Sequence, residues 1–308
     1  MKHLYIIGNG FDLHHDMKTK YTQFQKWLEE KKMHVLSTIN ALFDNNKDEN
    51  WWKNFEENLA SAVTSEIVQK EVKDNYPDIG SDDFRDKDWY NAEYAVERIL
   101  AEAYEEIRKA FHLWIAELEM GNPNKKIELM IDDVVFITFN YTLTLESLYD
   151  IDESKILHIH GKAGTNDELV LGHGVSEEKI EEMLEKDYPT NESGGYDYVT
   201  QRAKNAAISG VYNQRKNVDK IIKKYEKWFS SLKDVSHLYI YGHSFGDVDI
   251  PYFKKILSII NKKNVLIEVS DYKDENKFII DSFMQKENIG IEQYSIVNLN
   301  DKLLNKTH

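Results

Sequence analysis

Short apolar segments that alternate with amphipathic helical segments constrain the fold of this chain more than any other feature. In the last third, apolar runs at 237–242, 264–270 and 291–299 are separated by the helical patterns IPYFKKILSIINKK and ENKFIIDSFMQKE. Such alternation is typical of β-α-β units, in which the strands are parallel and helices cover both faces of the sheet. The chain also starts with a continuous apolar run, HLYIIG, as expected for a strand buried on both faces. We therefore predict an α/β fold with a Rossmann-like, mostly parallel sheet.

Helical insertions are predicted to interrupt this pattern twice, at about 31–124 and 176–233. The first contains WWKNFEENLASAVTSEIVQKEV, which has helical periodicity, and it closes at GNPNKK, where Gly and Pro stop the last helix. Strand signals lie between the insertions, at 133–141, 155–161 and 168–174. We expect a single α/β domain over residues 1–308 that carries both insertions.

Charge and composition narrow the classes of partner. The chain has 54 acidic and 39 basic residues, a net charge of −15, which disfavours broad binding to nucleic acid. Acidic neighbours also favour helix packing over a nucleic-acid platform for Trp51, Trp52, Trp89 and Trp114. No apolar stretch approaches the roughly 18 to 20 residues that a membrane helix needs, and the start carries no small-residue cleavage site. With no cysteine, disulfides and thiolate metal sites are excluded. We expect a cytoplasmic protein without a membrane partner.

The predicted strand ends carry the residues with chemical potential. Ligands bind at the carboxyl ends of the strands in open parallel sheets. Five ends are rich in glycine or polar residues: Gly8-Asn9-Gly10-Phe11-Asp12, Thr138-Phe139-Asn140-Tyr141, His158-Ile159-His160-Gly161, Gly172-His173-Gly174 and Gly242-His243-Ser244. We expect all five to converge on one crevice.

The first turn has the spacing G-x-G, but Leu13 stands where a dinucleotide fingerprint has its third glycine. A tight turn without a ligand fits the motif equally well. The carboxylate of Asp12 would repel a pyrophosphate, so this residue is expected to bind a ribose hydroxyl or to orient a side chain.

Two side chains on the next strands are candidates for catalysis. Asn140 follows an apolar run and either faces the crevice or caps the helical segment TLTLESLY. His160 precedes a glycine, so its imidazole is expected to be accessible and to titrate near neutrality. His158 lies on the same strand face by the period of two, and one of this pair can be a packed histidine.

The segment Gly242–Gly246 fits the G-x-S-x-G pattern of a serine nucleophile. The triad order requires a histidine after the serine, and the only one after Ser244 is His308. We therefore favour a ligand-binding turn, in which Gly242 lets a ligand approach the backbone and Ser244 donates a hydrogen bond. Asp249 at the start of the next helix joins this turn or acts as an N-cap.

Two alternatives remain at this stage. A metal-dependent hydrolase or nuclease would use imidazoles and carboxylates from the set His158, His160, His173, His243, Asp247 and Asp249. The chain lacks a tight motif such as H-E-x-x-H, so we expect no metal. A non-catalytic nucleotide sensor would use the same crevice without turnover. The roles of His158, His173 and His243 stay open.

Five segments together resemble the AbiH-type abortive-infection family of bacterial phage-defence proteins. They are IIGNGFDLHHDMKTKYTQF, WWKNFEENL, TFNYTLTLE, HIHG and YGHSFGDVDIPYF, and they span most of the chain in the family's order. The resemblance implies a role in antiviral defence and a phage-derived trigger, while a homo-oligomer stays open.

More distantly, the strand ends resemble sirtuin-like NAD-binding domains. This resemblance implies a sirtuin-like core in which Asn140 and His160 are catalytic. It also implies that Gly8, Gly10 and Phe11 contact the nucleotide and that Gly242 and Ser244 contact a ribose or phosphate. From their positions in the same two turns, we also expect Asn9, Asp12 and Asp249 to bind the nucleotide. Asn9 and Thr142 depart from the pattern, in place of a small alanine and an acidic residue, and the missing zinc cysteines argue against a protein deacylase. Defence proteins of this kind destroy NAD, which implies hydrolysis of the nicotinamide–ribose bond.

Overall fold

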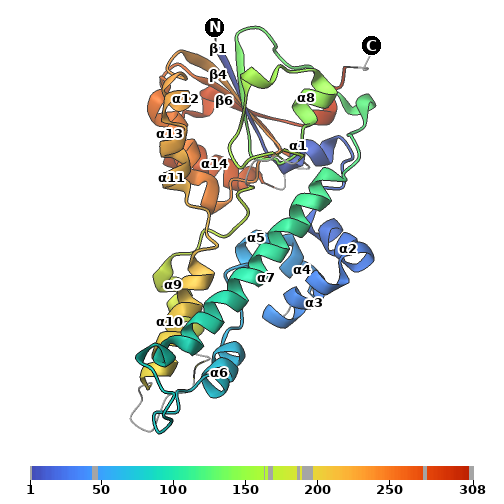
Figure 1. Cartoon of the computed structure of the whole chain (residues 1–308). Coiled ribbons are helices and arrows are strands. Elements are labelled where there is room, and N and C mark those ends of the chain that lie inside the picture. Colours follow the sequence, from blue (N-terminus) through green and yellow to red (C-terminus); the bar gives the residue numbers. More distant parts are fainter. Residues whose placement is uncertain are drawn as a thin grey trace. The chain divides into compact units, whose positions relative to one another are not determined.

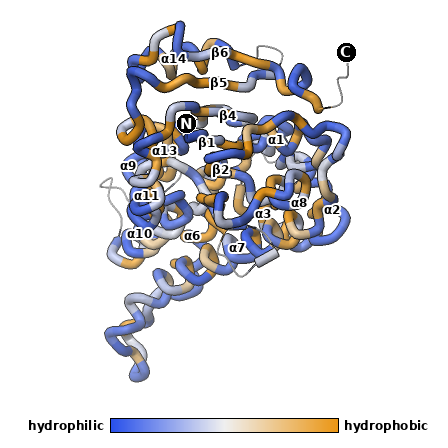
Figure 2. The backbone as a smooth tube through the Cα atoms, turned by 90° about the horizontal axis from the view of Figure 1, so that it is seen from above, coloured by the Kyte–Doolittle hydropathy of each residue, from blue (hydrophilic) through white to orange (hydrophobic). Residues whose placement is uncertain are grey.

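A six-stranded sheet forms the core of the protein in the computed structural model, and all of its neighbouring strands are parallel. The structure describes residues 2–43, 48–162, 164–165, 169–185, 188, 197–272 and 276–304. The strands are β1 (Lys2–Ile7), β2 (Val134–Thr138), β3 (Ile156–His158), β4 (Val235–Tyr241), β5 (Leu266–Ser270) and β6 (Tyr294–Val297). Their order is β3-β2-β1-β4-β5-β6, most of which can be followed in Figure 2. The predicted Rossmann-like parallel sheet is confirmed.

The central strand β1 pairs with β2 on one side and β4 on the other. Ile7, its last residue, lies beside Thr138 and Tyr241, so the three strands end at the same level. All residues of β1 after Lys2 are buried, and successive side chains enter two different apolar clusters. Burial on both faces explains why the sequence of this strand is continuously apolar.

The chain divides into two compact units, and the sheet lies in unit 1, which comprises residues 1–20, 112–170 and 217–308. Its helices are α1 (Asn9–His14), α8 (Thr144–Tyr149), α11 (Val218–Lys224), α12 (Glu226–Ser230), α13 (Ile250–Ile259) and α14 (Lys277–Lys286). Short 3₁₀ turns are η2 (Pro123–Lys125), η3 (Glu153–Lys155), η4 (Asp247–Asp249), η5 (Ile291–Gln293) and η6 (Leu299–Lys302). Helices α11–α14 cover one face of the sheet, and α1 and α8 cover the other (Figure 1).

Unit 2 comprises residues 21–111 and 171–216 and is helical. Its elements are α2 (Tyr21–Lys31), α3 (Met33–Leu42), α4 (Glu49–Lys53), α5 (Phe55–Asn58), α6 (Ser65–Asp74), η1 (Asp86–Tyr90), α9 (Glu177–Glu185) and α10 (Tyr198–Tyr212). The long helix α7 (Asn91–Ala116) starts in this unit and ends in unit 1. Helices α11 and α12, which the sequence places in the second insertion, belong to unit 1. Organisation as a single domain stays a prediction.

Tryptophans near the start of unit 2 form part of its core. Trp52 is fully buried and stacks on Phe55 with a ring separation of 5.3 Å, while Trp51 packs edge-on against both rings. Trp114, in unit 1, is 3% exposed. Rings that are buried in this way cannot stack on bases, which supports the interpretation that they pack helices.

The helical pattern around residues 51–72 is broken in the structure into α4, α5 and α6. The break follows from pairing with an earlier segment. Ala62 forms an antiparallel bridge with Phe43, and the Val63 N–H donates to the Leu42 carbonyl. Residues 59–64 therefore cannot continue a helix, although their composition favours one.

The strand predicted at 168–174 is wrong for its described residues, 169–174, which form only an isolated bridge between His173 and Arg215; Glu168 lies outside the described residues. The segment from residue 171 belongs to unit 2, where the Lys216 N–H donates to the His173 carbonyl. Its backbone thus pairs with the loop after α10 and not with the sheet. Gly172-His173-Gly174 is therefore not the end of a strand of the sheet.

No helix within the described ranges is long and apolar enough to cross a membrane.

Candidate functional site

The sheet has a point between β1 and β4 where the strand order reverses. The chain moves from β1 outward to β2 and β3, and it then returns to place β4 on the other side of β1. In doubly wound α/β proteins, ligands bind outside the strand ends at such a switch point. The turns that follow β1 and β4 contain the predicted nucleotide-binding residues. The structure therefore brings Gly8–Asp12 and Gly242–Ser244 together at this place.

The two turns touch through their backbones. The Gly10 N–H donates to the Gly242 carbonyl over 2.8 Å, and the Gly8 N–H donates to the Tyr241 carbonyl over 2.9 Å. A Cβ atom on Gly242 would lie 2.0 Å from the Phe11 nitrogen, and one on Gly10 would lie 2.8 Å from the Gly242 Cα. Gly242 also has a φ of +70°. These glycines are required for packing of the two turns, and their contact with a nucleotide stays a prediction.

Asp12 connects the β1 turn to the turn after β2. Its carboxylate is 1% exposed and accepts hydrogen bonds of 2.6 Å from the hydroxyls of Thr142 and Thr144. Of the two roles predicted for Asp12, the structure shows that of orienting side chains. Thr142 stands where the sirtuin-like pattern has an acidic residue. Its hydroxyl donates to the carboxylate of Asp12 on α1.

Asn140 lies beside the same connection and contacts the turn after β1. Its Nδ2 donates to the Gly8 carbonyl over 3.1 Å, and the residue is 6% exposed. Helix α8 starts after Leu143, and no side-chain hydrogen bond among the described residues caps it. The capping alternative for Asn140 is therefore wrong, and its amide instead holds the turn that follows β1.

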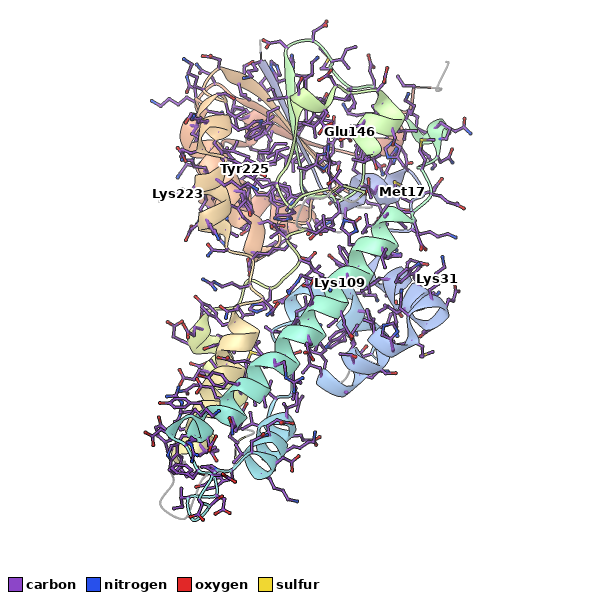
Figure 3. All side chains as sticks on the ribbon, viewed as in Figure 1. Met17, Lys31, Lys109, Glu146, Lys223 and Tyr225 are labelled. Atoms are coloured by element: carbon purple, nitrogen blue, oxygen red, sulfur yellow. The ribbon has the colours of Figure 1, made fainter. Side chains whose placement is uncertain are left out.

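His158 and His160 do not share a face, contrary to the period-of-two prediction. Strand β3 ends at His158, and the hydrogen bond from the Gly161 N–H to the His158 carbonyl closes a turn. His158 Nε2 lies 2.7 Å from Oε1 of Glu146 on α8, which Figure 3 labels. The ring of His160 packs edge-on against Phe139, whose cluster is on the opposite face of the sheet. The strand is too short for its alternation to continue to residue 160.

A carboxylate and two imidazoles meet beside these turns. His243 Nε2 lies 3.3 Å from Oδ2 of Asp249, and His160 Nε2 lies 4.0 Å from the other carboxylate oxygen. The three side chains come from the ends of β3 and β4 and from η4. All three residues belong to the larger set of imidazoles and carboxylates predicted from the sequence, but which of that set meet depends on strand order, because β3 and β4 are separated by two strands.

Hydrogen bonds fix the proton positions on two histidines. The Phe245 N–H donates to Nδ1 of His243 over 2.9 Å, so the ring proton of neutral His243 is on Nε2. In unit 2, His173 Nδ1 accepts from the Val175 N–H, and its Nε2 donates to the Val211 carbonyl. Neither ring keeps a free lone pair for a metal ion. Within the described ranges, no group of three or more His, Asp or Glu residues is arranged to hold one.

The two turns expose two polar side chains, Asn9 and Ser244. Asn9 Nδ2 donates to the Thr19 carbonyl over 3.2 Å. His308, on which the argument against a serine triad depends, lies outside the described residues. The interpretation of Ser244 as a ligand donor thus stays a prediction.

Burial shifts the pKa values of two groups near the β1 turn in opposite directions. Burial raises the pKa of Asp12 from its ordinary 3.8 to about 6, against the hydrogen bonds from Thr142, Thr144 and Asn140. Burial lowers the pKa of His15 from 6.5 to about 4. Burial holds His15 neutral, although the hydrogen bond from its Nδ1 to the Phe11 carbonyl raises its pKa. Its Nε2 lies 2.7 Å from the Tyr149 hydroxyl.

We predict that Asp12→Asn makes stability more sensitive to acid. Between about pH 6 and 4 the folded state binds a proton at Asp12 that the unfolded state does not, which stabilises the fold as pH falls. His15 has the opposite effect between 6.5 and 4, because only the unfolded state is protonated. Each contribution is about 3 kcal/mol, so they offset each other. From about pH 6 to pH 4, the free energy of unfolding of the variant, measured with urea, should fall by about 3 kcal/mol more than that of wild type. Asp132→Asn is the exposed control, and an acid dependence of Asp12→Asn equal to that of wild type would contradict the prediction.

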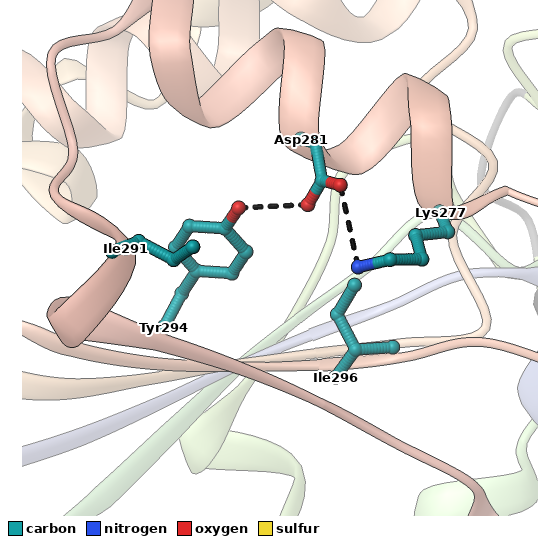
Figure 4. A pocket seen from close by; sticks show the side chains of 5 residues that line it. All are labelled: Lys277, Asp281, Ile291, Tyr294 and Ile296. Carbon is teal, nitrogen blue, oxygen red and sulfur yellow. Dashed lines mark hydrogen bonds and ion pairs between the residues drawn. The ribbon is translucent and has the colours of Figure 1, made fainter.

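A second feature of unit 1 is the pocket between α14 and β6 (Figure 4). It is lined by Lys277, Asp281, Ile291, Tyr294 and Ile296. The Tyr294 hydroxyl donates to Asp281 over 2.7 Å, and the Lys277 ammonium lies 3.3 Å from the same carboxylate. These polar groups satisfy one another, and the pocket lies at the edge strand, two strands from the switch point.

The strand order and the paired turns define a doubly wound α/β protein with its candidate site at the topological switch point. Residues 4–271 match the family described as Bacteriophage abortive infection AbiH. The chain belongs to this family, which supports a role in bacteriophage abortive infection. No curated protein matches the chain.

Proposed function

We propose that the protein binds NAD at the switch point and hydrolyses its nicotinamide–ribose bond. The observation that carries the proposal is the strand order β3-β2-β1-β4-β5-β6, with both glycine-containing turns at the point where it reverses. This is the arrangement in which doubly wound folds bind dinucleotides. The proposed setting is the cytoplasm of an infected bacterium, with a phage-derived trigger.

The chemistry requires few protein groups. Nicotinamide leaves as a neutral molecule from a cationic linkage, so no acid is needed to protonate it. The transition state resembles an oxocarbenium ion, and the protein must position the ribose and the attacking water. In this proposal Asn140 holds the ribose or the water through its amide, and His160 accepts a proton from water.

Burial of the two catalytic candidates fits this chemistry. His160 is 1% exposed, so the prediction of an accessible imidazole is wrong, and Asn140 is 6% exposed. Bulk water is kept from both side chains. Exclusion of water strengthens electrostatic interactions inside a site. NAD would approach from the side on which Asn9 and Ser244 are exposed, and the same burial also fits a sensor that binds a nucleotide without cleaving it.

The test is incubation of the purified protein with NAD, with nicotinamide and ADP-ribose measured by liquid chromatography and a thermal-shift titration on the same samples. Equal amounts of both products would support hydrolysis. A ligand-induced thermal shift without products, whether or not lysate from infected cells is added, would indicate a nucleotide sensor and not an enzyme. If neither products nor a thermal shift are observed, the NAD proposal is overturned.

We predict that Asn140→Ala lowers nicotinamide release by about 10²-fold or more, in the range of lost positioning and electrostatic stabilisation. The variant also removes one of two hydrogen bonds to the buried Gly8 carbonyl, which keeps the Phe11 N–H, so stability should fall by about 0.5–1.5 kcal/mol. Single-turnover rates and urea unfolding on the same preparation separate the two effects. Wild-type turnover in the folded variant would remove Asn140 from its role.

A further inference from the structure

Tyr252 carries a buried hydroxyl beside one of the two proposed catalytic residues. It is the third residue of α13, the helix that follows the turn after β4, and it is fully buried. Its ring packs edge-on against Phe139 and His160, with ring separations of 5.4 and 5.8 Å. The Tyr252 hydroxyl has no hydrogen-bond partner in the part of the chain that the structure describes. A hydroxyl that makes no hydrogen bond within the protein therefore lies next to His160.

Packing alone does not account for this hydroxyl. The next residue of α13, Phe253, stacks on the same Phe139 ring at 6.1 Å and fills its place in the core without a polar atom. A buried hydroxyl that makes no hydrogen bond destabilises the fold, because its hydration is lost and not replaced. Native proteins keep few such groups, and a role in catalysis or ligand binding is one of their explanations. Phenylalanine would fill position 252 equally well, so the hydroxyl indicates a ligand.

The surroundings of the Tyr252 hydroxyl favour one kind of ligand group. Burial, and after it the negative charge of Asp249, raises the pKa of Tyr252, so the hydroxyl stays neutral and can donate a hydrogen bond. The same carboxylate charge disfavours a second anion, such as a phosphate, at this place. A ribose hydroxyl is neutral and accepts the hydrogen bond that tyrosine donates. The chemistry therefore favours a sugar hydroxyl over a phosphate oxygen.

We infer that Tyr252 is a substrate-binding residue whose hydroxyl donates a hydrogen bond to a hydroxyl of the nicotinamide-bearing ribose of NAD. The inference rests on the proposed function and adds to it a residue that recognises the sugar. This ribose is selected because His160, the proposed base, acts at its C1′ and packs against Tyr252. Tyr252 is enclosed without ligand, so the turn between β4 and α13 moves to admit the ribose. This turn is open around Gly246, where an added Cβ would meet no atom within 4 Å.

Tyr252→Phe tests the inference through protein stability and ligand affinity together. The variant removes only a hydroxyl without a partner, so its Tm without ligand should equal or exceed that of wild type. Its Kd for ADP-ribose, the proposed product, should rise by about 3- to 10-fold in isothermal titration calorimetry, the range of one neutral hydrogen bond. Its Kd for ADP, which lacks the second ribose, should be unchanged.

Tyr104→Phe is the matched control, because Tyr104 is also buried but its hydroxyl donates to the Leu59 carbonyl over 2.8 Å. Its Tm should fall by about 2–4 °C, and its Kd for ADP-ribose should match that of wild type. A similar fall in Tm for Tyr252→Phe, or a failure of that variant to fold, would show that the Tyr252 hydroxyl has a structural role and would overturn the inference. An unchanged Kd for ADP-ribose, or an equal loss of affinity for ADP, would also overturn it.

The outcomes separate this inference from the proposed function. Binding of ADP-ribose that weakens in Tyr252→Phe, in a protein that does not cleave NAD, would retain the binding role of Tyr252 and reject the glycohydrolase. NAD cleavage with the same kcat and KM in wild type and Tyr252→Phe would retain the glycohydrolase and reject the role of Tyr252.

Discussion

His160→Ala is expected to lower the rate of nicotinamide release from NAD by about 10² to 10⁴-fold, the usual contribution of a general base. The imidazole is buried against Phe139 and Tyr252 and faces the Asp249 carboxylate, so no neighbouring side chain occupies its position. Alanine leaves a small cavity, and the expected change in KM is minor because the ring acts on water. Steady-state chromatography over a range of NAD concentrations measures both constants.

His158→Gln is the matched control for this experiment. His158 lies two residues earlier but contacts Glu146 on the other face of the sheet, and a glutamine amide can keep that contact. Its rate should stay within about threefold of wild type, since the His158 side chain contacts Glu146 and neither of the two proposed catalytic residues. Equal losses in both variants would show that the effect is structural, and an active, folded His160→Ala would exclude the imidazole as the base.

Gly242→Ala is expected to destabilise the fold by more than about 4 kcal/mol, in the range of the most damaging single substitutions. Its positive φ is unfavourable for alanine by about 1–2 kcal/mol. The added Cβ would also lie 2.0 Å from the Phe11 nitrogen and 2.5 Å from the Gly10 carbonyl carbon. Both are backbone atoms in the turn after β1, so relief requires separation of the two turns.

Urea unfolding followed by circular dichroism measures this loss, and a large fall in soluble yield is the expected first sign. Gly246→Ala is the control in the same loop, because no atom lies within 4 Å of the Cβ that it would add. Its stability should match that of wild type within about 0.5 kcal/mol. Wild-type stability in Gly242→Ala would show that the two turns are not packed as described.

The sequence allowed the sheet to be predicted well because its strands are buried on both faces and end in recognisable turns. The continuous apolar run of β1 and the alternation after residue 237 required no tertiary information. The segment at 168–174 has the same apolar character, but the loop that ends at Lys216 competes for its backbone. No local pattern reports such a partner.

The candidate site was predictable residue by residue but not as an arrangement. Asn140 and His160 could be named because they follow apolar strands, whereas the bond from Asn140 to Gly8 depends on which strands are neighbours. The contact between His243 and Asp249 depends on a turn whose geometry is set by Phe245 at a φ of +57°. Local sequence shows polar strand ends, and strand order decides which of them meet.

The central position of β1 has a consequence for the synthesis of the protein. Its partners β2 and β4 begin only at Val134 and Val235, and much of unit 2 is encoded between β1 and β2. Contacts over such sequence distances form late, and segments without their partners stay exposed on the ribosome. The turn after β1 therefore cannot pack against Gly242 until that residue has been synthesised. The group formed by His160, His243 and Asp249 is complete only once Asp249 has been added. A nascent chain that ends before this residue lacks part of the candidate site, which is therefore completed only after most of the protein has been translated.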